Sequence, residues 1–220
     1  MQDQKQTPAI VADPIGRIAD SACAGDLEGI RNWVRSGVDL TGLDHSGGTL
    51  LEVVVGQMAF FPDAPRYEVV AELLRCGADA RQLNADGFGP LFAAVLNMDT
   101  EMIRILLDAG ADPNAEKMDF EFESLYGWAE FDYRYEIWNV NPPERATDAD
   151  RSDEDAWLAH LDRLAVKYER RRPDHLQLLR QRGALSMAEL RNMAGAGTAQ
   201  SGPSQSVTCQ QADGRPKAQR

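Results

Sequence analysis

The chain has 220 residues, of which 43% are apolar, enough for one domain with a sizeable core or for one elongated repeat domain. It carries 35 acidic and 23 basic residues, which gives a net charge of −12. Nucleic acid is not an expected partner, because phosphate binding requires an excess of Lys and Arg. A basic protein would be attracted by such a field, although solubility alone is the other interpretation of the charge.

Three cysteines, Cys23, Cys76 and Cys209, lie far apart and form no Cys-x-x-Cys motif, which predicts reduced thiols in a cytoplasmic protein. The first twenty residues contain no apolar core of a secretory signal. No apolar run approaches the roughly 18 residues of a membrane span, so we expect no membrane association. A non-classical export signal in the polar N-terminus stays open as an alternative.

The sequence predicts a flexible N-terminus over residues 1–12, followed by one helical domain over 13–193. Residues 194–220 are rich in Gly, Ser, Gln and Pro and predict a disordered tail. Within the domain, paired helical patterns fill four segments, and insertions interrupt two of them. The segments are 13–43, 44–83, 84–116 and 117–185, and the insertions lie near 56–66 and at 135–171.

The third segment, 84–116, shows why these patterns predict helix pairs. Pro90 suits the first position of a helix, where its missing N–H costs nothing. Four apolar residues then recur at the spacing of one face of a second helix. Such a pair cannot bury both of its sides alone, so we expect it to stack on the pairs before and after it. The four apolar residues are Met102, Ile103, Leu106 and Leu107.

An internal repeat connects the segments. The phrase "LLRCGADARQLNADG" at 73–87 recurs as "LLDAGADPNAEKMD" at 106–119, and the interval from Gly77 to Gly110 defines its period. Looser versions surround Gly37, which precedes Gly77 by slightly more than one period, and Gly183, which follows Gly110 by slightly more than two. One period is therefore intact, one carries a short insertion and one carries a long insertion.

The fourth segment is predicted to be split, with a first helix at 123–134 and a second at 172–184. Between them, an extended loop precedes a helix whose acidic start and basic end suit the helix dipole. An apolar stripe on that helix predicts packing against the stack. Its residues are Trp157, Leu158, Leu161, Leu164, Ala165 and Tyr168. Ser186 and Glu189 predict a capping box for a short final helix.

This period of about 33 positions, with "GxxPLxxA" before a second apolar helix and "GADxN", resembles the ankyrin repeat. The resemblance is specific in 84–116 and covers about 13–190 less the insertions, but Gly89, Phe92 and Met98 depart from the usual Thr, His and Gly. It implies an all-α ankyrin-repeat solenoid of about four helix-turn-helix repeats, with an extra helix inserted in the last. The split fourth segment is similar to bacterial ankyrin-repeat proteins. The matching residues are Gly87, Pro90, Leu91, Ala94, Ile103, Leu106, Leu107, Gly110, Ala111, Asp112 and Asn114.

In ankyrin proteins, the turns between repeats and the concave helix face carry partner contacts, and this implies two rows of candidate residues here. The turn row is His45, Ser46, Ala85, Asp86, Phe88, Asp119 and Glu121. The concave row is Gln57, Leu96, Asn97, Glu130 and Phe131, with Gln57 placed in doubt by the nearby insertion.

Aromatic residues add a second group of candidates. Tyr and Trp bury a large area at low entropic cost, so Phe131, Tyr133, Tyr135 and Trp138 either clad the inserted segment or bind a partner. Phe60 and Phe61 in the first insertion either anchor a partner or fold back onto the repeats. Trp128 is expected to face the interior.

No chemical motif accompanies this pattern. His45, His160 and His175 have no metal-ligand spacing, and no phosphate loop or catalytic motif occurs. We therefore expect a non-catalytic protein-binding module that needs no cofactor or metal and is a monomer when unbound. The preferred hypothesis is a bacterial immunity-type inhibitor of a basic toxin or effector domain. The alternative is a secreted ankyrin effector or adaptor that docks onto a host protein.

Overall fold

The computed structural model describes residues 13–61, 64–115 and 124–198, and within these ranges it contains ten α-helices and no strand. The helices are α1 (Pro14–Cys23), α2 (Leu27–Arg35), α3 (Leu50–Met58), α4 (Arg66–Arg75), α5 (Pro90–Leu96), α6 (Thr100–Asp108), α7 (Leu125–Trp138), α8 (Glu154–Lys167), α9 (Asp174–Gln181) and α10 (Met187–Thr198). A short 3₁₀ helix, η1 (Ala149–Arg151), precedes α8. The all-helical fold predicted from the sequence is confirmed for the described residues.

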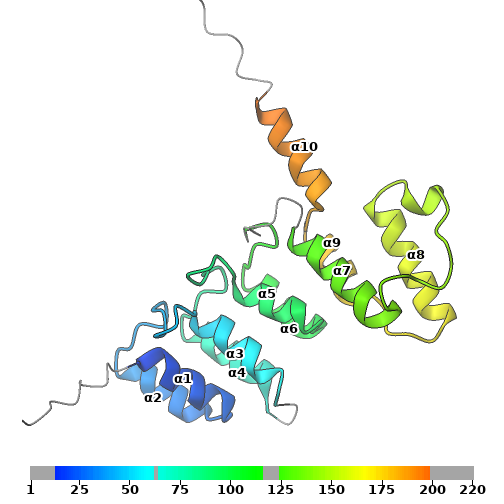
Figure 1. The fold of residues 1–220 in the computed structure, drawn as a ribbon. Helices are drawn as coiled ribbons and strands as arrows, with labels where there is room; N and C mark the ends of the chain where they lie inside the picture. Colours follow the sequence, from blue (N-terminus) through cyan, green and yellow to red (C-terminus); the bar gives the residue numbers. More distant parts are fainter. Residues whose placement is uncertain (1–12, 62–63, 116–123, 199–220) are drawn as a thin grey trace, which may run out of the picture.

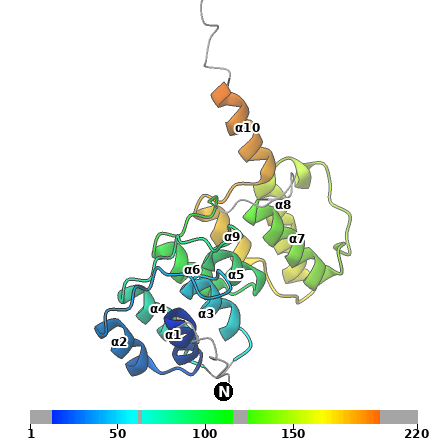
Figure 2. The same cartoon turned by 60° about the vertical axis from the view of Figure 1, so that its left-hand side comes forward.

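The helices form two layers, which are visible as a row of pairs in Figures 1 and 2. In one layer α1, α3, α5 and α7 are successive neighbours, and in the other α2, α4, α6 and α9 are successive neighbours. Consecutive helices pair across the layers as α1 with α2, α3 with α4 and α5 with α6, whereas α7 pairs with α9. This arrangement is consistent with an ankyrin-repeat solenoid.

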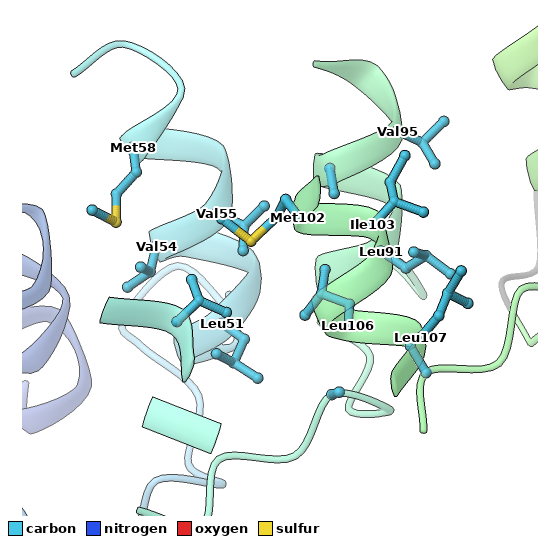
Figure 3. Packing of buried hydrophobic residues seen from close by; sticks show 14 of the residues in the cluster. Leu51, Val54, Val55, Met58, Leu91, Val95, Met102, Ile103, Leu106 and Leu107 are labelled. Carbon is cyan, nitrogen blue, oxygen red and sulfur yellow. The ribbon is translucent and has the colours of Figure 1, made fainter. Parts of the chain in front are cut away.

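The core runs between the layers and between neighbouring pairs. Figure 3 shows Val55 of α3 facing Met102 of α6, whereas Val54 and Met58 project from the opposite side of α3, away from α5 and α6. Ile103 and Leu106 are completely buried, as the helical spacing of the sequence requires. Because each pair buries apolar side chains against its neighbours, no pair holds a core of its own.

The ends of the second-layer helices repeat the same local chemistry. Asp39, Asp79 and Asp112 each accept a hydrogen bond, at 2.9 to 3.0 Å, from the backbone N–H two residues further on. The glycine two residues before each aspartate has a positive φ, between 84° and 103°, which a residue without Cβ adopts at no steric cost. The glycines that define the sequence repeat are thus the residues that end these helices.

Hydrogen bonds also join successive pairs at their loops. Ala85 N–H donates to the Gly47 carbonyl at 3.0 Å. The Asn114 side chain donates to the Gly183 carbonyl and accepts from the Leu185 N–H, both at 2.9 Å. Asn114 therefore joins the loop after α6 to the loop after α9, although these loops lie far apart in the chain.

The elements after the third pair differ in length from the expectations. Helix α7 continues to Trp138, past its expected end at residue 134, and stops where Asn139 adopts a left-handed conformation with φ 49°. Helix α8 ends at Lys167, so the basic run Arg170–Arg172 lies in the connection to α9. The expected capping box is confirmed, because Ser186 N–H donates to Glu189 Oε2 at 2.8 Å and Glu189 N–H to Ser186 Oγ at 3.3 Å.

Helix α10 continues to Thr198, into the expected tail, and projects from the rest of the molecule in both views (Figures 1 and 2). The predicted flexible N-terminus at 1–12 and the tail from residue 199 onward lie outside the described residues.

Candidate partner-binding surface

Two turns of the expected turn row lie at the surface and are held by side chains just before them. Asp44 Oδ1 accepts from the N–H groups of Ser46 and Gly48, each at 2.8 Å. Asn84 Oδ1 accepts from the N–H groups of Asp86 and Phe88, each at 2.9 Å. The turn residues His45, Ser46, Ala85 and Asp86 are exposed or partly exposed.

His45 and Phe88 both have partners within the chain. His45 Nδ1 lies 2.8 Å from Asp13 Oδ2, and this contact raises the pKa of the imidazole. Phe88 is half-buried, with its ring stacked on Phe92 at a centroid distance of 4.6 Å. Phe88 therefore packs against the helix that follows its turn and does not project freely into solvent. Asp119 and Glu121, the last two members of the turn row, lie outside the described residues.

The concave row is exposed on α5, but its register on α7 differs from the expectation. Leu96 and Asn97 are exposed and lie seven and eight residues after Gly89, the N-cap of α5. The N-cap of α7 is Ser124, so the matching positions are Phe131 and Asp132 rather than Glu130 and Phe131. Gln57 is exposed at the matching position of α3, and its side chain accepts a hydrogen bond from Cys23 Sγ at 3.2 Å.

Glu130 points into the molecule. Its Oε1 accepts a hydrogen bond from Trp157 Nε1 of α8 at 2.7 Å, and its carboxylate pairs with Arg134 at 2.6 Å. Only 14% of its side chain is exposed. Glu130 therefore holds α8 against α7 and is not available as a groove residue.

The aromatic residues of α7 divide between core and surface. Tyr133 is completely buried and donates a hydrogen bond to the Arg171 carbonyl at 2.6 Å, so it lies in the core and not on the expected surface. Trp138 is half-buried and meets Tyr168 edge-on at a centroid distance of 6.2 Å. Phe131 and Tyr135 are 46% and 52% exposed.

Trp128 is half-buried, so it faces the interior only in part, and it joins these two exposed rings on one side of α7. Its ring lies 6.3 Å from that of Phe131, which lies 6.3 Å from that of Tyr135. The three residues are spaced at i, i+3 and i+7, which places them on one helix face. We refer to Trp128, Phe131 and Tyr135 as the aromatic face of α7.

Two carboxylates border this aromatic face. Asp132 and Glu136 are four residues apart, and no Lys, Arg or His of the described chain lies within ion-pair distance of either. Burial raises the pKa of Asp132, and the charge of Glu136 raises it further. The sequence-based prediction missed both residues, although their i, i+4 spacing beside aromatic residues is visible in the sequence.

Phe60 and Phe61 lie at the surface after α3, 81% and 51% exposed. They do not fold back onto the repeats, which was the alternative left open by the sequence. A solvent-exposed Phe pair is unusual for a residue type that normally lies inside.

The cleft between the second and third helix pairs is lined by charged groups that already have partners. Its volume is about 410 Å³. There Arg66 lies 3.2 Å from Asp99, and Arg171 donates to the Met98 carbonyl. His160 and His175 are buried, and burial lowers the pKa of His175 to about 3. The described residues contain no group of three or more His, Cys, Asp or Glu arranged to hold a metal ion.

Comparison with known proteins agrees with the repeat pattern. The ankyrin repeat family matches residues 86–117, which span α5, α6 and the turn before them. No curated protein matches the chain. None of the helices in the described ranges has the length and apolar character needed to cross a membrane. Ankyrin repeats are protein-binding modules and are typically non-catalytic, so this match indicates another protein as the partner.

Proposed function

We propose that the whole domain is a bacterial-type ankyrin array of about four repeats, with α8 inserted into the last. The contacts that support this place α7 beside α5 in one layer and α9 beside α6 in the other. Helix α8 lies outside these two layers (Figures 1 and 2). The hydrogen bonds of Asn114 to residues 183 and 185 join the third unit to the fourth as Ala85 joins the third to the second.

We further propose that this array is an immunity-type inhibitor, which binds and neutralises a basic toxin or effector domain in the cytoplasm without catalysing a reaction. The observation that carries the proposal is the exposed aromatic face of α7 with unpaired carboxylates at its border. Aromatic anchors supply contact area, and an excess of negative charge accelerates association with a basic partner and selects against acidic ones.

A binding experiment with the product of the adjacent gene tests this function. The purified chain is used to capture that protein at low and at high salt, and the toxicity of the neighbour is measured with and without the chain. We expect a complex that forms more slowly in high salt, together with loss of toxicity. A neighbour that does not bind, or that stays toxic in the complex, contradicts the proposal.

The secreted-effector alternative depends on residues 1–12, which lie outside the described residues, and no contact of the described chain favours it. A translocation reporter fused to residues 1–30 separates the two functions, because a cytoplasmic inhibitor gives no export of the reporter.

A further inference from the structure

The outer side of α7 combines two features that protein cores and helix surfaces ordinarily avoid. Phe131 and Tyr135 leave about half of their side-chain surface in water, which costs hydrophobic free energy. Asp132 and Glu136 are like charges at i, i+4, a spacing that destabilises a helix. A contact with another molecule would cover these rings and supply partners for the two carboxylates.

The geometry of these side chains defines the chemistry of that contact. On a helix of 3.6 residues per turn, Asp132 and Glu136 lie along the edge of the aromatic face. An arginine or lysine side chain is attracted by the face of an aromatic ring and forms ion pairs with a carboxylate beside it. The planar guanidinium suits both interactions at once, because it stacks on rings and donates in a fork to carboxylates.

The other side chains of α7 offer no second site for an arginine or lysine side chain. Glu130 on the opposite side is already paired with Arg134 and with the indole of Trp157, and Tyr133 is buried. Two cations near this end of the molecule are paired elsewhere, since Arg172 lies 2.7 Å from Asp162 and Arg180 lies 2.7 Å from Glu189. Arg170 lines the cleft beside Glu136 but forms no ion pair with it. The uncompensated negative charge of α7 is therefore confined to the border of the aromatic face.

We propose that the aromatic face of α7, with Asp132 and Glu136, is the docking site for an arginine-bearing basic segment of the partner protein. This inference rests on the proposed function and names the part of the surface and the partner chemistry that the function uses. Arginine side chains lie across the rings of Phe131 and Tyr135 and pair with the two carboxylates.

The test uses the full chain and an oligo-arginine peptide as the probe, with an oligo-glutamate peptide as the negative control. Because a chain of net charge −12 attracts any polycation, the comparison is between two double variants that each remove two negative charges. One is Asp132→Asn with Glu136→Gln. The other is Asp20→Asn with Glu68→Gln, two exposed residues on α1 and α4.

We expect the α7 variant to weaken peptide binding by about tenfold or more and the control variant by less than about twofold, since distant surface charges are screened. A third double variant, Phe131→Ala with Tyr135→Ala, should weaken binding without changing the net charge. Circular dichroism confirms that each variant is folded. Equal weakening by the two charge variants, or unchanged binding by the aromatic variant, overturns the inference.

These results are separable from the test of the proposed function. If the neighbouring gene product is captured and neutralised with the same affinity by the Asp132→Asn, Glu136→Gln variant, the docking site is wrong and the inhibitor function stands. If the peptide binds at α7 but the neighbour is not captured, the surface chemistry stands and the inhibitor function is wrong.

Discussion

Single side chains of this molecule divide between scaffold and surface, and His175 is a scaffold residue whose pKa is shifted by burial. It is completely buried beside Tyr133, with a ring centroid distance of 5.7 Å. Burial is the main cause that lowers its pKa to about 3, and the nearby charge of Arg171 acts in the same direction. The neutral imidazole is therefore the form that the folded chain accepts.

This shift makes folding stability depend on pH. The unfolded chain binds a proton at His175 near pH 6.5, whereas the folded chain does not until about pH 3, so stability is lost as the pH falls through this window. We expect His175→Phe to make the free energy of unfolding depend less steeply on pH between pH 6.5 and 5, which lies above the ordinary pKa values of Asp and Glu. Urea unfolding at three pH values measures this. A variant that keeps the slope of the original chain contradicts the assignment.

Substitutions at Phe131 and Leu106 should separate binding from folding. Leu106 is completely buried, and Leu106→Ala is expected to cost about 2–5 kcal/mol of unfolding free energy. Phe131 is 46% exposed, so Phe131→Ala should leave unfolding nearly unchanged and weaken partner binding by about 1–3 kcal/mol. Denaturant unfolding and titration calorimetry provide the two measurements. If Phe131→Ala unfolds the protein, Phe131 belongs to the folded core and its assignment to the binding surface is wrong.

Among the elements, α8 is joined to α7 by a polar contact that the sequence does not reveal. Glu130 accepts from the Trp157 indole and pairs with Arg134, so Glu130→Ala leaves both donors without their acceptor. We expect a loss of about 1–3 kcal/mol and faster amide exchange in α8. Glu130→Gln should lose less, because its amide oxygen still accepts from the indole.

The matched control is Glu101→Ala. Glu101 pairs with Arg104 at 2.8 Å, but both side chains are nearly half exposed, and such surface pairs contribute little. Equal destabilisation by Glu101→Ala and Glu130→Ala would show that Glu130 has no special role in holding α8.

The helices could be predicted from the sequence wherever the repeat period is intact. Where the loop before a helix changes in length, the sequence did not show which residues of that helix face the groove. The N-caps Thr49 and Gly89 lie equally far after the glycines that end the preceding helices, but the N-cap Ser124 lies two positions further from its glycine. Counting by the period therefore places Glu130 in the groove. Measured from the N-cap, however, the residue that matches Asn97 is Asp132. Tyr133 matches the buried Met98 in the same way, which is why it lies in the core.

The candidate surface was predictable only in part. Exposed Phe131, Tyr135 and Leu96 follow from position in the repeat and from aromatic content. The pairing of Glu130 with Trp157 joins two helices through a tertiary contact, which no local pattern encodes. For this reason the sequence does not show which carboxylates of α7 are paired and which are left without an ion-pair partner.

At the scale of the whole molecule, stability should depend on neighbouring pairs rather than on one centre. Arg31 of α2 contacts Glu72 of α4 at 2.7 Å, and α1 packs along α3. Removal of residues 1–43 exposes the apolar side of α3 to water, so we expect a clearly lower melting temperature with the other helices still formed. Circular dichroism during heating measures it. A variant that lacks only residues 1–12 keeps both helices, and identical melting of the two truncations contradicts nearest-neighbour stabilisation.

Asn114 joins the loop after α6 to the loop after α9 by hydrogen bonds between distant parts of the chain. The two layers continue from α5 to α7 and from α6 to α9, although the chain leaves them between α7 and α9. The excursion from Asn139 to Arg170 is thus an insertion whose length the two layers leave open, while Leu158 and Leu161 must keep their places in the shared core. Exchanging the rest of it for another sequence offers a way to give this scaffold a new specificity while its helical rows stay in place.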